Sequence, residues 1–144
     1  MPSAAPQPRM TLYIDGACGM CSREANLMVR LDQGRGFIAF DDINRPDFDP
    51  ASLGRSAHDV HTRIHAKLDD GRVIEGLEVF RRAYALIGRG WLLAPTGWPI
   101  LRPIFEALYR LFARHRRRIS RLFFANACPM PPPPSAMLRA RDSA

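Results

Sequence analysis

The sequence contains few cysteines, a single lysine and no long apolar run. Its three cysteines, Cys18, Cys21 and Cys128, are too few and too unevenly spaced for the disulfide framework of a small secreted domain. Charged residues interrupt the most apolar region, at 91–124, before it reaches the roughly 20 apolar residues that a membrane-spanning helix requires. The amino-terminal sequence MPSAAPQPRM lacks the apolar core of a signal peptide. We therefore expect a cytoplasmic protein.

The chain does contain enough apolar material for one folded domain. Hydrophobic residues make up 47% of its 144 positions and charged residues 24%, which is typical of a globular protein. The net charge of +7 belongs to one end, because residues 1–101 carry equal numbers of acidic and basic side chains. A nucleic-acid-binding domain usually spreads basic residues over its folded body. We therefore expect a neutral domain with a basic appendage at 102–144, and no nucleic-acid partner.

Apolar spacing in the first third predicts a strand, a helix and a second strand. The β-prone run at 10–14 stops at the turn signal Asp15-Gly16. Apolar residues then recur every three to four positions over 18–31, and glycines follow this helix. Residues 37–40 are a second apolar run, so the three elements should form a parallel βαβ unit. Residues 41–58 are rich in Asp, Pro and Ser and predict a surface connection with one short helical turn and little chemistry.

The middle of the chain predicts a hairpin followed by a helix. Residues 64–68 and 72–74 flank an Asp-Asp-Gly turn, which is the strongest hairpin signal in the sequence. Residues 77–87 carry apolar side chains at helical spacing and are followed by two glycines. The predicted fold class is therefore α/β, with a βαβ unit and a ββα unit in one mixed sheet flanked by helices.

The two ends of the chain differ in composition from this domain at 10–90. Residues 1–9 predict a disordered, Pro-rich lead. Residues 91–124 predict an irregular hydrophobic segment packed on the body and a basic helix from about 101 to 120, which together form a C-terminal helical extension. Residues 125–144 contain a run of prolines and predict a disordered tail. Cys128 in that tail is interpreted as an incidental thiol, with a regulatory role as the alternative.

The most informative motif is Cys18-Gly19-Met20-Cys21, which falls between the first strand and the first helix. Unpaired backbone N–H groups at a helix start lower the pKa of a thiol placed there. Cys18 is therefore the predicted nucleophile. Cys21 lies one turn further along on the same face, within disulfide reach, and is the predicted resolving thiol. Gly19 allows close approach of another backbone, and Met20 offers a flexible apolar contact beside the sulfur atoms.

This constellation resembles the signature of the DCC family of predicted thiol–disulfide oxidoreductases, named for one Asp and two Cys. Asp15, Cys18 and Cys21 carry the resemblance, which extends over about residues 10–120 through Ile64-His65, Asp70-Gly71, Gly76, the Trp91 region and 109–118. It implies a thioredoxin-like fold and a protein-disulfide reductase type of activity on largely undefined substrates. Substrates would be disulfide-containing proteins or small thiols, with a separate reductant and no bound cofactor.

One departure from true thioredoxins concerns the residues that face the redox pair. Thioredoxins place a cis-proline there, just before the strand that enters the hairpin. Arg63 and Ile64 occupy this position here, with no proline nearby. We therefore expect Arg63 and Ile64, together with Gly19 and Met20, to contact the substrate in an altered way.

Asp15 has two interpretations. It can exchange a proton with Cys21 during the reaction, as a buried carboxylate does in thioredoxin-like proteins, or it can accept backbone N–H bonds in the Asp-Gly turn. The structural interpretation is the favoured one. A carboxylate near a thiol also raises the pKa of that thiol through like-charge repulsion, which opposes the effect of the helix start.

Two other interpretations of the cysteine pair remain open. The pair can be half of a zinc site completed by His58, His61 and His65. On a strand, however, His61 and His65 would lie about 13 Å apart, so no metal is assigned. The pair can also be two inert buried cysteines. Redox chemistry is preferred to both.

The basic helix at 101–121 also has more than one interpretation. Covering the domain core with a solvated basic face is the simplest. Contact with an anionic membrane surface comes second, because tryptophan and phenylalanine residues accompany the arginines. A non-catalytic adaptor protein that binds through this helix is the alternative to an enzyme.

Overall fold

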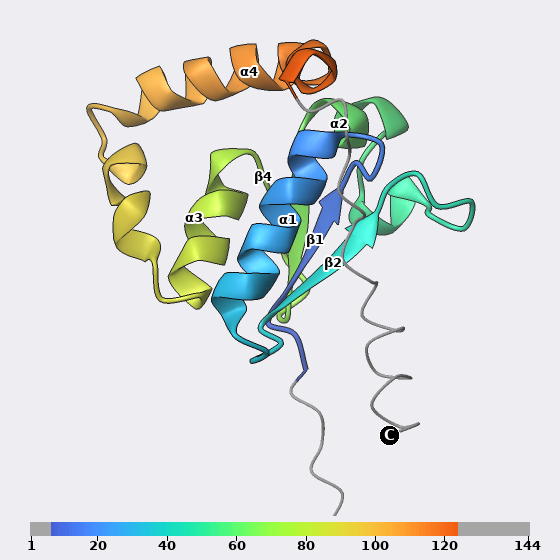
Figure 1. Cartoon of the computed structure of the whole chain (residues 1–144), viewed down its shortest axis with the longest axis horizontal. Coiled ribbons are helices and arrows are strands. Elements are labelled where there is room, and N and C mark those ends of the chain that lie inside the picture. The colour runs from blue at the N-terminus through green and yellow to red at the C-terminus, as the bar shows by residue number, and fades with distance from the viewer. Residues whose placement is uncertain (1–6, 124–144) are drawn as a thin grey trace, which may run out of the picture.

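The computed structural model describes residues 7–123, which contain one mixed four-stranded sheet. The strand order is β2-β1-β3-β4, with β1 parallel to β2 and antiparallel to β3, and β4 antiparallel to β3 (Figure 1). The strands are β1 (Met10–Ile14), β2 (Ile38–Asp42), β3 (His65–Leu68) and β4 (Val73–Glu75). The predicted α/β class with a mixed sheet is confirmed and is consistent with a thioredoxin-like fold.

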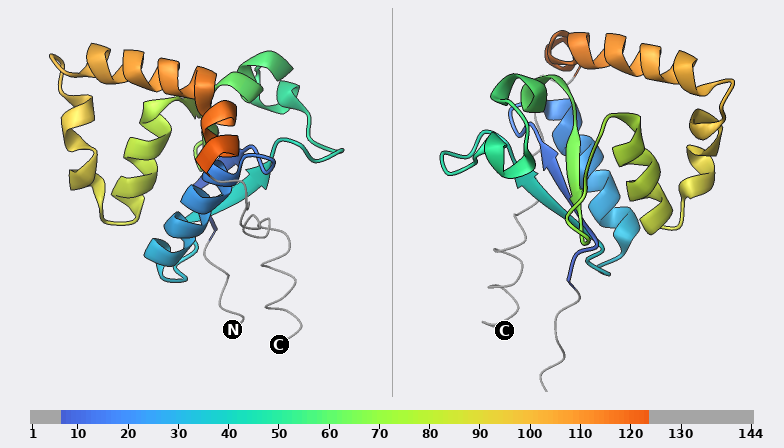
Figure 2. Two further views of the ribbon diagram at one scale, coloured as in Figure 1. Left: turned by 45° about the horizontal axis from the view of Figure 1, so that its top comes forward. Right: turned by 180° about the vertical axis from the view of Figure 1, so that it is seen from behind.

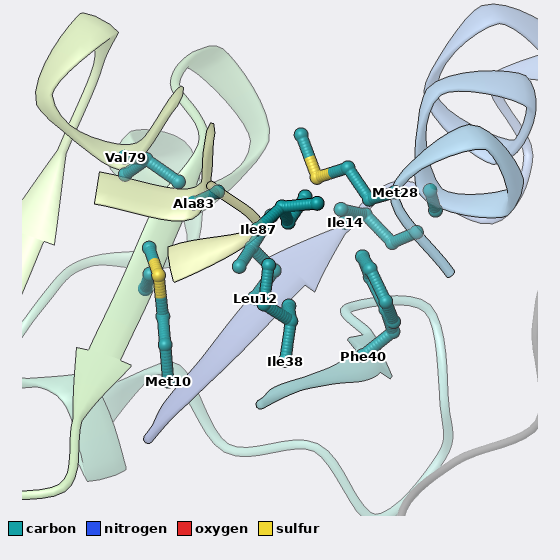
Figure 3. Packing of buried hydrophobic residues seen from close by; sticks show 11 residues of the cluster. Met10, Leu12, Ile14, Met28, Ile38, Phe40, Val79, Ala83 and Ile87 are labelled. Carbon is teal, nitrogen blue, oxygen red and sulfur yellow. The ribbon is translucent and has the colours of Figure 1, made fainter. Parts of the chain in front are cut away.

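Two helices cover one face of the sheet, α1 (Gly19–Asp32) and α3 (Leu77–Leu86). Alternate residues of β1, namely Met10, Leu12 and Ile14, point to this face and are buried (Figure 3). They pack in one cluster with apolar residues of both helices and of β2. The alternating apolar side chains of β1 therefore hold α1 against the sheet, and this packing fixes the position of the cysteine pair at the start of α1.

The opposite face carries a smaller cluster that the sequence prediction underestimated. Tyr13, on the other side of β1, packs against Ile43, Leu53 and Val60. Val60 belongs to α2 (Ala57–Thr62), and Leu53 ends the 3-10 helix η1 (Pro50–Leu53). The connection therefore holds two helical segments where one short turn was predicted. The overlooked signal is a capping box, in which the side chains of Ser56 and Asp59 each accept from the other's backbone N–H.

Residues 91–100 pack on the domain less closely than predicted. They form the 3-10 helices η2 (Gly90–Leu92) and η3 (Ala94–Gly97), which lie against α3. Arg81 holds η3 through its side chain, which donates to the Thr96 carbonyl oxygen at 2.8 Å. Trp91 and Trp98 remain 69% and 60% exposed. A polar contact, rather than burial of the aromatic rings, therefore secures this segment.

The last described helix, α4 (Arg102–Phe123), crosses the end of the sheet where β1 ends and α1 begins (Figure 1). Its final turns point toward the start of α1 (Figure 2, left). Its buried residues, Ala113, Arg116 and Ser120, recur at three- and four-residue spacing and form the face turned to the domain. No helix within residues 7–123 is long and apolar enough to cross a bilayer.

Candidate active site

The cysteine pair lies where the sequence predicts it. Cys18 has extended backbone angles and caps α1, and its carbonyl oxygen accepts the first helical hydrogen bond from the Ser22 N–H at 3.1 Å. Cys21 follows in the first turn of the helix, and both residues are free thiols. The turn between β1 and α1 is closed by a hydrogen bond from the Cys18 N–H to the Asp15 carbonyl oxygen at 3.0 Å. The pair is thus fixed between two well-packed elements.

Residues from the end of β2 hold this turn in place. Asp42 accepts the Gly16 N–H at 3.0 Å, and the Asn44 side chain donates to Asp15 Oδ1 at 2.8 Å. A side chain at position 16 would collide with the Asp42 carboxylate, which is why glycine stands there. Asp42 and Asn44 lie in the segment for which little chemistry was predicted, and that prediction is wrong. The parallel pairing of Ile14 with Asp42 brings the ends of β1 and β2 together, and the predicted βαβ unit was the sequence feature that could have indicated this.

Helix α4 covers the pair. The Met20 N–H donates to Ser120 Oγ at 3.4 Å, and Arg117 donates to Asp15 Oδ2 at 3.0 Å. Arg116 donates to the carbonyl oxygen of His61 at 2.7 Å, which fixes α4 to the end of α2. Cys18 is only 2% exposed. It lies outside the main apolar cluster, and the Ser120 hydroxyl of α4 bonds to its sulfur.

The four predicted substrate contacts fall into two groups. Gly19 is buried at the start of α1. The Met20 N–H donates to Ser120 Oγ, and the Ile64 N–H donates to the Tyr109 hydroxyl at 3.2 Å, so both bonds go to α4. Arg63 is exposed and donates to Glu75 at 2.9 Å. Helix α4 therefore occupies the backbone positions that were expected to meet the substrate.

The two thiols differ in acidity. The pKa of Cys18 is lowered to about 5, chiefly because the Cys21 thiol donates a hydrogen bond to its sulfur. Burial acts in the opposite direction, but the Cys21 N–H, the Ser120 hydroxyl and the charge of Arg116 add to the lowering. The pKa of Cys21 is raised, because its proton is held by Cys18 and because it is buried near negative charge. Cys18 is thus the thiolate of the pair at neutral pH and Cys21 the thiol.

Asp15 acts as an ionised anchor of the site. It is 1% exposed, and burial alone would raise its pKa, yet the pKa is lowered by hydrogen bonds from Asn44 and Arg117, by the charge of Arg117 and by the Ala17 N–H. The Ala17 contact is the backbone bond of the favoured structural interpretation, and Arg117 adds a contact from α4. The Asp15 charge also raises the pKa of Cys21, so the carboxylate acts on the resolving thiol.

The histidines do not gather around the cysteines. His58 and His61 are exposed residues of α2. The distance predicted between His61 and His65 assumed that both lie on one strand, and that assumption is wrong. His65 is buried in β3, with its Nδ1 3.0 Å from the Arg63 carbonyl oxygen and its Nε2 3.3 Å from Glu75. Within residues 7–123, no three His, Cys, Asp or Glu side chains are grouped to hold a metal ion. Cys128 lies outside the described residues.

Comparison with known proteins assigns the chain to a family. The family model of DCC1-like thiol-disulfide oxidoreductases matches residues 12–122, so the chain belongs to this family. An uncharacterized chloroplastic protein of Arabidopsis thaliana is 31% identical over 113 residues, or 78% of this chain. The chain spans about half the length of that relative, 53%. No solved structure gave a significant match.

The low pKa of Cys18 predicts an unusual pH profile for alkylation of the reduced protein by iodoacetamide. The rate should rise with pH around a midpoint near 5 and level off below pH 7, because only the thiolate reacts. Replacing Cys21 by alanine removes the main hydrogen bond and should move the midpoint upward. Thiolate absorbance at 240 nm gives an independent measurement. A midpoint near 9 in the unchanged protein would contradict this account.

Proposed function

We propose that this chain exchanges electrons with disulfides through Cys18 and Cys21. The observation that carries the proposal is the opposite displacement of the two pKa values at the start of α1. A thiolate that exists at neutral pH beside a protonated partner is the arrangement that thiol–disulfide exchange needs. Membership of a family of thiol-disulfide oxidoreductases supports the same reaction class.

The reaction proceeds in two displacements. The Cys18 thiolate attacks one sulfur of the substrate disulfide, forms a mixed disulfide and releases the other half as a thiolate, which takes a proton from solvent. Cys18 then carries no charge, so its hydrogen bond and its charge no longer raise the pKa of Cys21, while burial and the Asp15 charge still do. Cys21 loses its proton, attacks the Cys18 sulfur and releases the second thiolate. The substrate gains two electrons, and the protein is left with a Cys18–Cys21 disulfide, which an external dithiol reduces.

Asp15 is a positioning residue in this scheme. Its carboxylate is ionised and already accepts four contacts, so its first role is to hold the turn before Cys18 and to bind α4. The charge that it places near Cys21 also raises the pKa of that thiol, both before and after Cys18 has reacted. The proton-exchange role predicted as the alternative is secondary.

Exchange with any disulfide also requires α4 to move from Cys18. At 2% exposure Cys18 cannot meet a substrate. The contacts of the last turns of α4 beside it, those of Arg117 and Ser120, are polar, whereas the apolar contact of Tyr109 with Phe80 lies further back along the helix. The arginine of the Arg117–Asp15 pair has a side chain that is 54% exposed. Polar contacts at half-exposed positions contribute about 1 kcal/mol each, so local opening of α4 is accessible without unfolding of the domain.

Serine variants test the assignment of the two cysteines. Cys18→Ser should reduce a small aromatic disulfide no faster than buffer does, because no nucleophile remains. Cys21→Ser should complete the first displacement only, so that a mixed disulfide at Cys18 accumulates and is visible as an adduct by intact-protein mass spectrometry. Equal activity of both variants and the unchanged protein would exclude the proposal.

Arg117→Ala tests the covering role of α4. Loss of about 1 kcal/mol from the closed state should increase the alkylation rate of Cys18 about fivefold at pH 8, where the thiolate is fully formed. Arg117→Lys should restore part of the protection. The matched control is Arg121→Ala, an exposed arginine of the same helix, which should leave the rate unchanged. An alkylation rate of Cys18 that is unchanged in Arg117→Ala would disprove this role of the Arg117–Asp15 ion pair.

A second candidate function is binding to an anionic membrane surface, which the outward face of α4 favours. Ile104, Leu108 and Leu111 are each more than half exposed and recur at four- and three-residue spacing. Arginines accompany them along the helix, and exposed Trp91 and Trp98 lie just before it. Apolar side chains with flanking positive charge are typical of helices that lie on anionic bilayers. This binding is compatible with the redox activity.

Vesicle sedimentation tests this second candidate. The protein should bind vesicles that contain phosphatidylserine and ignore those of phosphatidylcholine alone. Leu108→Glu should weaken binding about tenfold or more, since it removes apolar burial worth ~2 kcal/mol. Leu27→Glu, at an exposed leucine of α1, is the control and should not alter binding. Equal partition with both lipids, or no partition, would eliminate the membrane candidate.

A further inference from the structure

A groove of about 880 Å³ runs between α2 and α4. Its walls come from two short stretches that are far apart in the sequence, residues 58–63 and 107–117. The volume falls in the range of sites for small molecules and is too small to enclose a protein domain. The groove therefore suits a ligand the size of a tripeptide or less.

The walls of this groove are strongly basic. Five of the lining side chains are arginines, and Asp59 is the only carboxylate among the lining residues. The arginines are Arg63, Arg110, Arg114, Arg116 and Arg117. Within residues 7–123, Arg110 and Arg114 form no ion pair with a carboxylate, so their charges are available to a ligand. Guanidinium groups bind carboxylates through paired hydrogen bonds.

The groove adjoins the cysteine site across a wall formed by α4. Arg116 and Ala113 line it and also line a second cavity of about 240 Å³ that contains Cys21. Arg116 lowers the pKa of both thiols, and Arg117 reaches Asp15 at 3.0 Å. A molecule held by its negative charges in the groove therefore lies beside Arg116 and Arg117, the two arginines next to the cysteine site.

We propose that this groove is the substrate-binding site and selects small disulfides or thiols that carry carboxylates. This inference rests on the proposed exchange reaction and specifies its substrate class. Arg110 and Arg114 bind the carboxylates of the substrate, and the reacting sulfur reaches Cys18 once α4 has moved aside. Asp15 is the carboxylate that Arg117 binds in the free protein. An anionic substrate competes with Asp15 for this arginine, so substrate binding weakens the contact that keeps α4 closed.

Three small disulfides of matched size test this inference through their charge. Dithiodiglycolate carries two negative charges, bis(2-hydroxyethyl) disulfide none and cystamine two positive charges. The reduced protein is mixed with each in a single turnover, and loss of thiolate absorbance at 240 nm gives the second-order rate constant. Dividing each constant by that of free dithiothreitol with the same disulfide removes differences in intrinsic reactivity. The normalised constants should fall in the order anionic, neutral, cationic, and the anionic advantage should shrink at high salt.

Arginine variants locate the effect. The double variant Arg110→Ala/Arg114→Ala should lower the ratio of the anionic to the neutral constant about tenfold. Arg118→Ala removes an equally exposed arginine of the same helix that does not line the groove, and it should leave this ratio unchanged. Equal normalised constants for all three disulfides, or an equal loss with Arg118→Ala, would overturn the inference while the exchange reaction stands. Absence of Cys18-dependent reaction with all three would overturn the exchange reaction as well.

Discussion

The buried carboxylate of Asp15 connects the parts of the molecule on which the site depends. It closes the turn after β1, receives the side chain of Asn44 from beyond β2 and binds Arg117 of α4. A charge at 1% exposure is tolerated only when its hydrogen-bonding capacity is filled, and these partners fill it. The same contacts fix the direction in which α1 starts and the position of the helix that covers it. Removal of Arg117 would leave the charge to its contacts with Ala17, Asn44 and Arg116.

The second constraint is that a thiolate is stabilised in a place from which solvent is excluded. Burial opposes ionisation of Cys18, and the neighbouring Cys21 thiol, the Ser120 hydroxyl and Arg116 outweigh it. Two of these three groups come from α4, so the helix that restricts access to the sulfur also makes the sulfur reactive. Reactivity and protection are therefore coupled through one element. This coupling fits a redox centre that reacts only after a partner has displaced part of its cover.

Helix α4 has two faces with different environments. Its inner face carries Ala113, Arg116 and Ser120 and contacts the redox site, whereas its outer face carries exposed apolar residues and arginines. A long amphipathic helix normally turns its apolar side to the core. Here the inner face also carries Tyr109, whose ring packs against Phe80, while Leu108 and Leu111 face outward. This second, exposed apolar surface gives α4 more than a packing role.

The sequence alone determined most of the elements and the position of the cysteine pair. The alternation along residues 10–14, the helical spacing after Cys18 and the Asp-Asp-Gly turn are local patterns, and local patterns report which faces are apolar. They were sufficient for the mixed sheet and for the pair at the start of α1. They were not sufficient for α2, because its signal was a polar capping box within a segment that otherwise has the composition of a loop.

Only the tertiary structure decided what surrounds the sulfur atoms. The partners of Asp15 and Cys18 come from Asn44, Arg116, Arg117 and Ser120, and the last three lie about a hundred residues from the cysteines in the chain. No spacing rule connects side chains at that separation. Their meeting depends on how β2 ends beside β1 and on where residues 91–100 direct α4. The exposure of the thiols and their pKa values are consequently properties of the assembled fold. The presence of two thiols one helical turn apart, by contrast, follows from the sequence alone.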